Sequence, residues 1–215
     1  MTRDDRLRGL YAITDPKLGG ELPLPQQVEQ ALQGGARVIQ YRDKGDDPVR
    51  RLAEAQTLAG CCHRHNALLL INDDVALALA SGADGVHLGR NDADIEQARA
   101  QLGECAIIGV SCYNQLQLAQ QASAAGADYV AFGRFFPSQT KPGAVQAEPL
   151  LLRQARHEID LPLVAIGGIT PENGRPLIDA GADMLAVIHA IFGQPDIKTA
   201  CQAFQSLFQA EDSPT

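Results

Sequence analysis

Gly126-Ala127-Asp128-Tyr129-Val130 is one of four imperfect copies of a motif that decides the fold of this chain. The other copies are Gly34-Gly35-Ala36-Arg37-Val38-Ile39, Gly82-Ala83-Asp84-Gly85-Val86 and Gly181-Ala182-Asp183-Met184-Leu185. Each copy is typical of the end of a helix, a tight turn with glycine and the start of an apolar strand. The copies lie roughly 45 to 55 residues apart, a spacing that suits two strand-helix units. Four copies therefore predict eight strands and eight helices.

Short apolar runs alternate along the chain with longer segments of helical period. The predicted strands are Leu10–Ile13, Val38–Tyr41, Leu68–Ile71, Gly85–Leu88, Ile107–Val110, Tyr129–Phe132, Leu163–Ile166 and Met184–Ile188. The predicted helices are Gln26–Gln33, Pro48–His65, Asp74–Ala80, Ala93–Gln101, Asn114–Ala125, Glu148–His157, Pro171–Ala180 and Ile197–Phe208. The pattern predicts an α/β fold, a single-domain (βα)8 TIM barrel with parallel strands over residues 1–210. The polar tail 211–215 is predicted to be disordered.

An open doubly wound sheet is the alternative fold. It is disfavoured because no early G-x-G-x-x-G follows the first strand, and because the fourfold repetition offers no natural switch point.

Composition limits the class of function. The 215 residues carry a net charge of -8, which argues against nucleic-acid binding and against binding to anionic membranes. Five cysteines show no spacing of a disulfide framework or a zinc site, and the charged N-terminus lacks the apolar core of a signal peptide. We expect a cytoplasmic protein in which any phosphate recognition is local.

The segment after the second predicted strand is rich in cations. Side chains alternate along an extended chain, so Gln40, Arg42 and Lys44 are predicted to project to one side. In a barrel of this type the active site lies at the carboxyl ends of the strands. An arbitrary R-x-K is more often solvated surface charge, but the position of this pair favours the active site.

Carboxylates follow the third and fourth predicted strands, as Asn72-Asp73-Asp74 and as Asp92. Singly, Asp73 or Asp74 could cap the third helix, and Asp92 the fourth. Together at the mouth of the barrel, carboxylates at neighbouring strand ends favour Mg²⁺, which takes one or two carboxylates with phosphate oxygens and waters.

Two further connections suit anion binding. The irregular segment from Gly133 to Gly143 places Ser138, Thr140 and Lys141 in what we expect to be a mobile lid, with an inert loop as the alternative. Gly167-Gly168 after the seventh strand and Ile188-His189 after the eighth lie at the usual phosphate site of this fold.

The remaining polar residues give weaker evidence of function. Ser111 after the fifth strand could bind substrate, cap the next helix, or do both. His87 is expected to be packed and hydrogen-bonded within its strand, although an inward orientation would place it under the site. His63 and His65 are two apart on a helix and are expected at the surface. No nucleophile, base and orienting acid form a recognisable triad.

In order and spacing, the motifs resemble those of the thiamine phosphate synthase family from about Leu10 to Phe192. They are Gln40-x-Arg42-x-Lys44, Asn72-Asp73, Gly85-Val86-His87-Leu88-Gly89 with Asp92, Pro137-Ser138-x-Thr140-Lys141 and Ile166-Gly167-Gly168-Ile169. The resemblance implies a transferase of thiamine biosynthesis that joins hydroxymethylpyrimidine diphosphate to hydroxyethylthiazole phosphate and releases pyrophosphate. It implies that the C–O bond breaks first and that the thiazole nitrogen captures the resulting cation.

The resemblance also implies roles for single residues. Those that hold the diphosphate are Arg42, Lys44, Asn72 and Lys141, and those that hold Mg²⁺ are Asp73 and Asp92. The pyrimidine is contacted by Gln40 and Ser111, the reacting phosphates by Ser138 and Thr140, and the thiazole phosphate by Gly168 and the backbone at Ile188.

This chain departs from the family pattern at three positions. Arg90 stands where the family usually has Gln, Ser138 where it has Thr, and His189 where it commonly has Ser. Ser138 keeps the hydroxyl, whereas His189 either supplies a phosphate contact of its own or narrows the thiazole pocket. The alternative functions are a thiazole tautomerase, which would gain nothing from the charged cluster, and a non-catalytic thiazole-phosphate-binding protein. A homo-oligomer is compatible with the sequence.

Overall fold

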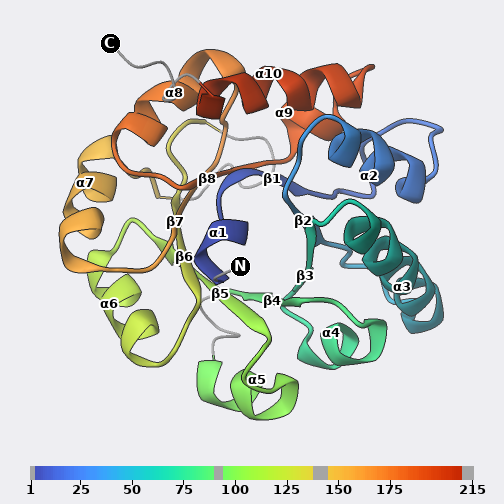
Figure 1. Cartoon of the computed structure of the whole chain (residues 1–215), viewed down its shortest axis with the longest axis horizontal. Coiled ribbons are helices and arrows are strands. Elements are labelled where there is room, and N and C mark those ends of the chain that lie inside the picture. The colour runs from blue at the N-terminus through green and yellow to red at the C-terminus, as the bar shows by residue number, and fades with distance from the viewer. Residues whose placement is uncertain (1–2, 90–93, 138–144, 210–215) are drawn as a thin grey trace.

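Parallel strands form a closed barrel in the computed structural model, which describes residues 3–89, 94–137 and 145–209 (Figure 1). Within these ranges the barrel has eight strands in chain order, and β1 pairs with both β2 and β8. The strands are β1 Gly9–Ile13, β2 Val38–Tyr41, β3 Leu68–Asn72, β4 Gly85–Leu88, β5 Ile107–Tyr113, β6 Tyr129–Gly133, β7 Leu163–Ile166 and β8 Met184–Val187. The predicted α/β barrel is confirmed.

Helices surround the barrel on its outer side (Figure 1). They are α2 Leu24–Gln33, α3 Pro48–Arg64, α4 Val75–Ser81, α5 Ile95–Leu102, α6 Leu116–Ala124, α7 Pro149–Glu158, α8 Pro171–Asp179 and α10 Ile197–Gln209. Two short helices were not predicted, α1 Arg3–Arg6, drawn within the ring of strands, and α9 His189–Phe192. Among the described residues, no helix is long and apolar enough to cross a membrane.

Four strands end at other residues than predicted at the end of the barrel that carries the site. β3 and β6 each run one residue further, to Asn72 and Gly133, and the ends of β5 and β8 affect predicted site residues. β5 runs on to Tyr113, with a register shift against β6 between Ser111 and Tyr113, so Ser111 lies within the strand. β8 ends at Val187, and Ile188 is instead the residue before α9. Both differences arise where tertiary contacts override a local apolar pattern. The predicted tail 211–215 lies outside the described residues.

The strands separate two apolar cores. Alternate strand residues point outward and pack against the helices, as Ile39, Leu69 and Val130 do. The others fill the barrel interior, which Leu7 enters from the segment after α1. The interior is therefore a packed core, and a cavity lies above it at the carboxyl ends of the strands.

The repeated motif has a structural role in each copy. Its glycine has a positive φ four times, at 100° for Gly35, 72° for Gly82, 89° for Gly126 and 109° for Gly181, a conformation that favours glycine. In three copies the aspartate that follows joins its own strand to the strand before it.

Asp128 shows this junction most clearly. Its N–H donates to Ile108 O at 2.7 Å, and its carboxylate accepts from Ile108 N–H at 2.8 Å and from the Arg99 guanidinium at 2.6 Å. Asp84 and Asp183 make the same pair of bonds to Leu69 and Leu163.

The first copy has Arg37 in place of aspartate and keeps only the backbone half of this junction. Its N–H donates to Leu10 O, while its side chain turns to the carbonyl of Asp5. The four copies therefore mark four double units, as the spacing predicted.

We predict that Asp128→Ala lowers the free energy of unfolding by about 2–4 kcal/mol, because Ile108 N–H loses its acceptor and the largely buried Arg99 guanidinium loses its only carboxylate partner among the described residues. Urea unfolding followed by far-UV circular dichroism measures this loss. The control is Asp160→Ala at an exposed position, which should change stability by less than about 0.5 kcal/mol. Equal effects in the two variants would contradict a structural role for the motif.

Candidate active site

A cavity of about 330 Å³ opens at the carboxyl ends of the strands. Its floor consists of interior barrel residues, including Ile13, Val164 and Ala186, and its rim consists of the segments that follow the strands. An apolar floor under a polar rim suits a flat organic ring that carries a charged group. The cavity therefore lies where the sequence predicted the active site.

Seven of the predicted site residues line this cavity. They are Gln40, Arg42, Asn72, Ser111, Gly168, Ile188 and His189. Gln40 is almost fully buried, with 2% of its surface exposed, because it belongs to β2 and points into the barrel. Strand register thus brings together residues that lie far apart in the sequence.

The charged side chains in the described lining of the cavity are all basic. The described lining residues include Arg42 and Arg134 but no Asp or Glu, in a chain whose net charge is -8. Such a concentration of positive charge in a concave site attracts anions.

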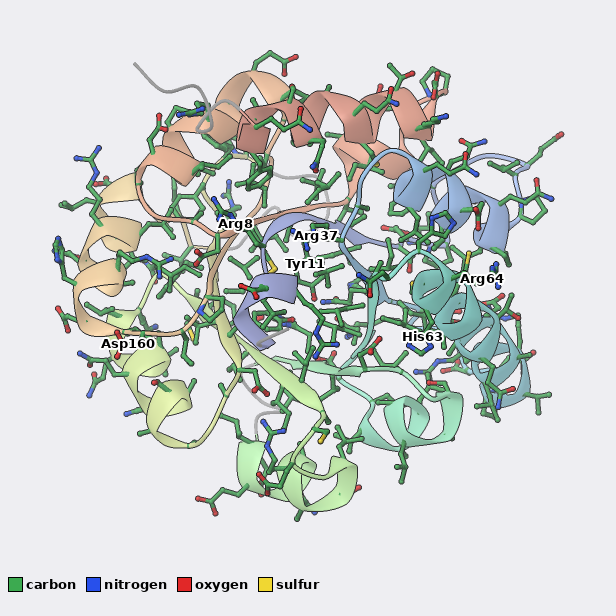
Figure 2. All side chains as sticks on the ribbon, viewed as in Figure 1. Arg8, Tyr11, Arg37, His63, Arg64 and Asp160 are labelled. Atoms are coloured by element: carbon green, nitrogen blue, oxygen red, sulfur yellow. The ribbon has the colours of Figure 1, made fainter. Side chains whose placement is uncertain are left out.

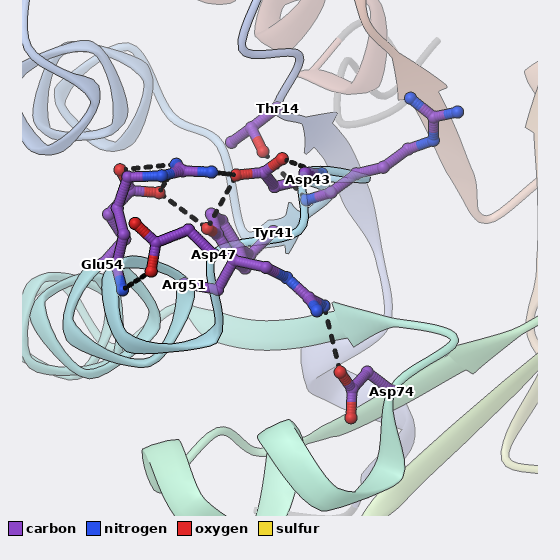
Figure 3. A network of polar contacts seen from close by, with 10 residues as sticks. Thr14, Tyr41, Asp43, Asp47, Arg51, Glu54 and Asp74 are labelled. Carbon is purple, nitrogen blue, oxygen red and sulfur yellow. Dashed lines mark hydrogen bonds and ion pairs between the residues drawn. The ribbon is translucent and has the colours of Figure 1, made fainter.

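Arg42 stays available to a ligand, whereas Arg50 and Arg51 are held by acidic neighbours, and Figure 3 shows Arg51 reaching toward Asp74. Arg50 donates to Asp43 and to both oxygens of Glu54, and Arg51 donates to Asp74 at 3.0 Å. Among the described residues, the Arg42 guanidinium has no ion pair, and its backbone N–H is held by Thr14 Oγ1 at 3.0 Å. The local acids are thus taken up by other cations, which leaves Arg42 to face the cavity.

Asp43 and Tyr41 anchor this network. Burial opposes ionisation of Asp43, but hydrogen bonds from Gly45 N–H and Arg50 outweigh it and lower the pKa of that carboxyl. Tyr41 donates to Glu54 at 2.6 Å, and burial together with this carboxylate raises the pKa of the phenol. The network is therefore a fixed set of charges beside the cavity.

Lys44 and Asp73 form a pair beside the cavity rather than within its lining. Lys44 Nζ lies 3.2 Å from Asp73 Oδ2, which also accepts from Asn72 Nδ2 at 2.7 Å. Asp73 Oδ1 accepts from Gly89 N–H at 3.1 Å. Asp74, not Asp73, caps α4 through Leu77 N–H, so the capping alternative for Asp73 is excluded.

The Gly167-Gly168 turn lies close to neighbouring backbone. A Cβ at Gly168 would lie 2.3 Å from Pro137 O, and φ at Gly168 is 63°. Thr170 N–H at the start of α8 is satisfied by Asn173 Oδ1 at 2.8 Å. Glycine is thus required here both by conformation and by space.

His189 begins α9, and its imidazole lies against Gly193 at the other end of that helix. The side chain is exposed at the rim. His63 and His65 lie away from the cavity and pair with Asp84 and Glu29, as expected for surface residues. Figure 2 shows His63 among the outer helices, whereas Tyr11 lies inside the ring of strands.

Four predicted site residues lie outside the described residues, namely Asp92, Ser138, Thr140 and Lys141. Arg90 and most of the predicted lid lie there too.

The sequence did not single out Tyr11 and Tyr129, and it gave little weight to His87. All three point into the barrel, where the two phenol oxygens are 2.9 Å apart and His87 Nδ1 lies 2.8 Å from Tyr129 Oη. Ser111 bonds to the other ring nitrogen of His87, and it does not cap α6, which begins after Gln115. The available signal was a polar aromatic in an otherwise aliphatic strand, which alone does not distinguish a packed residue from a functional one.

Known proteins identify the family. Residues 10–191 match the family model described as thiamine monophosphate synthase. The chain is also 52% identical to the thiamine-phosphate synthase of Nitrosococcus oceani, over 97% of this chain and 96% of that protein. The chain belongs to the thiamine monophosphate synthase family.

Other members of the thiamine monophosphate synthase family agree in sequence and in structure. Identity to the thiamine-phosphate synthase of Thiobacillus denitrificans is 52%, over 94% of this chain and 96% of that protein. A solved structure of thiamine phosphate pyrophosphorylase from Pyrococcus furiosus is 34% identical, with a TM-score of 0.89, over 99% of this chain and 100% of that one.

We predict that Gly168→Ala in this thiamine monophosphate synthase family member costs about 2–4 kcal/mol of stability, through positive φ and the contact with Pro137. Gly82→Ala is the matched control, since Gly82 has a φ of 72° but open space at its Cβ position. It should cost only about 1 kcal/mol. Calorimetric titration with inorganic phosphate should show weaker binding for Gly168→Ala alone. Equal binding and stability of both variants would contradict a close-packed phosphate turn.

Proposed function

We propose that the protein joins hydroxymethylpyrimidine diphosphate to hydroxyethylthiazole phosphate, giving thiamine phosphate and pyrophosphate. The observation that carries this proposal is the cavity itself, which combines an apolar floor with arginines and no described carboxylate in its lining. Two phosphorylated ring substrates need this combination, since the rings need apolar surface and the phosphates need local positive charge.

The diphosphate is assigned to the rim formed after β2 and β3. Arg42 and Asn72 line the cavity there, and Lys44 lies beside it, with Lys141 added from the segment after β6. Cations on a leaving pyrophosphate stabilise the negative charge that builds as the C–O bond breaks. These side chains act by binding and electrostatics, which agrees with the absence of a recognisable triad.

Electron flow in this reaction needs no general base. The C–O bond to the diphosphate breaks with its electron pair leaving on pyrophosphate, and the pyrimidine methylene becomes a cation. The thiazole nitrogen then donates its lone pair to that carbon and forms the C–N bond. Gln40 and Ser111 hold the pyrimidine, and the apolar floor keeps water from the cation.

Mg²⁺ is the implied metal, and Asp73 fits it. The Asp73 carboxylate is 27% exposed beside the cavity, and its two oxygens accept three described hydrogen bonds of roughly four that a carboxylate can take. Asp92 would be the second carboxylate. No cluster of three or more His, Cys, Asp or Glu residues suited to a metal occurs in the described part of the chain, which agrees with a site completed by phosphate oxygens. When bound, the metal supplies charge neutralisation to the leaving group.

The thiazole phosphate is assigned to the opposite rim. Gly168 and Ile188 present backbone there, and His189 adds an exposed imidazole. Ser138 and Thr140 would contact the reacting phosphates. The cytoplasmic location and the homo-oligomer stay predictions from the sequence.

The proposed function is tested by one assay with both precursors, which follows pyrophosphate and thiamine phosphate with Mg²⁺ and with a chelator. We expect equal amounts of both products, and only with the metal.

In the same assay, Asp92→Asn should shift the Mg²⁺ titration to higher concentration. The matched control is Asp74→Asn, because asparagine also caps a helix and Asp74 is assigned to α4. Folded wild-type protein without product would favour the tautomerase or the binding protein.

A second prediction concerns the cations on the leaving group. Arg42→Ala and Lys141→Ala should each lower kcat by at least about tenfold through lost charge stabilisation. Arg153→Ala, at an exposed position on α7, is the matched control and should leave kcat unchanged. Turnover close to wild type in both site variants would remove the diphosphate assignment.

A further inference from the structure

A chain of hydrogen bonds crosses the barrel beneath the cavity. Gln40 Nε2 lies 2.6 Å from Tyr11 Oη, and Tyr11 Oη lies 2.9 Å from Tyr129 Oη. Tyr129 Oη is 2.8 Å from His87 Nδ1, and His87 Nε2 is 2.9 Å from Ser111 Oγ. The chain thus joins five strands and connects two residues assigned to the pyrimidine, Gln40 and Ser111.

Packing holds the rings of this chain in place. His87 stacks on Tyr129 with ring centroids 5.6 Å apart, and Tyr11 meets Tyr129 edge to face at 6.1 Å. Gly109 leaves room for the Tyr129 ring, because a Cβ there would lie 1.9 Å from Tyr129 Cζ. With little freedom for the rings to rotate, each hydrogen bond keeps its partner.

Only the first hydrogen bond of this series has a fixed direction, because an amide nitrogen can only donate, so Gln40 donates to Tyr11. Either phenol can donate in the next bond, and in the order that we infer Tyr11 gives its single proton to Tyr129. The proton of Tyr129 then goes to His87 Nδ1, which must accept. Burial raises the pKa of both phenols well above the usual value, so each retains its one proton.

This order also fixes the tautomer of His87 and the direction of the last hydrogen bond, to Ser111. A neutral imidazole that accepts at Nδ1 carries its proton at Nε2 and donates it to Ser111 Oγ. The Ser111 hydroxyl then accepts from the protein, and its own proton is left for the cavity that it lines. In the reverse order Tyr129 donates to Tyr11, the proton of Tyr11 turns to the Gln40 carbonyl or to the cavity, and Ser111 becomes an acceptor toward the cavity instead.

We propose that His87, Tyr129 and Tyr11 are positioning residues that present Ser111 to the substrate as a hydrogen-bond donor. This inference rests on the proposed function for the identity of the substrate. It adds a specificity rule, namely that the ring atom opposite Ser111 must be an acceptor, such as an unprotonated ring nitrogen of the aminopyrimidine. A ring with N–H at that position would leave two donors facing each other.

The proton order is tested by ¹⁵N NMR of histidine-labelled protein without substrate. The chain has five histidines, and the signals of His87 are assigned by their absence from the spectrum of His87→Gln. We expect His87 as the Nε2–H tautomer in wild type and in Tyr41→Phe, which removes a phenol from the outer face of the sheet. In Tyr129→Phe, Nδ1 loses its donor, and the single tautomer should give way to a mixture. An Nδ1–H ring in the wild type, or one protonated on both nitrogens, would overturn the proposal.

The positioning role is tested by steady-state kinetics of the same variants. Tyr129→Phe should raise KM for the pyrimidine diphosphate about three- to tenfold, with KM for the thiazole phosphate unchanged. His87→Gln, which keeps an N–H donor near the place of Nε2, should retain more affinity than His87→Leu. An unchanged pyrimidine KM in folded Tyr129→Phe and His87→Leu would overturn the role.

The two tests separate this inference from the proposed function. A wild-type protein that forms no product contradicts the function, while the NMR spectrum still decides the proton order. A wild-type protein that turns over with His87 in the wrong tautomer leaves the function intact and refutes the inference.

Discussion

The hydrogen bond between Tyr11 and Tyr129 is the interaction on which the site depends. The barrel interior must be filled, because a void there would lose contacts on every side, yet the largely apolar floor of the cavity also needs a few polar groups to orient a ring. Two phenols meet both requirements, since their rings pack among aliphatic side chains and their hydroxyl groups satisfy each other at 2.9 Å.

Ion pairs between neighbouring side chains, rather than the net charge of the protein, set the charge of the cavity. The chain has eight more acidic than basic groups, and still the described cavity lining contains no carboxylate. Near the cavity, Arg50 pairs with Asp43 and Glu54, and Arg51 pairs with Asp74. Arg42 is left facing the cavity, so a chain of net negative charge concentrates positive charge at one concave place.

The turns at the amino ends of the strands repeat along the chain, whereas the segments at the carboxyl ends, which form the site, do not. The Gly-Ala-Asp motif places the same turn before each even-numbered strand, and in three copies the aspartate makes the same two bonds to the preceding strand. The segments at the opposite end of the strands share no such pattern, and they contribute different groups to the lining of the cavity. Repetition thus secures the barrel, while variation at the carboxyl ends supplies the chemistry.

The sequence by itself determined the barrel, the order of its strands and the seven predicted residues that line the cavity. These follow from local information, namely apolar period, turn glycines and the rule that strand ends meet. Only the tertiary structure decided that Asp74 rather than Asp73 caps α4, that His189 begins a helix, and that Tyr11, Tyr129 and His87 connect Gln40 with Ser111. Tyr11 and Tyr129 are 118 positions apart, and closure of the barrel brings them into contact. No local pattern reports such a contact, since it depends on strand register and on the space that Gly109 leaves open.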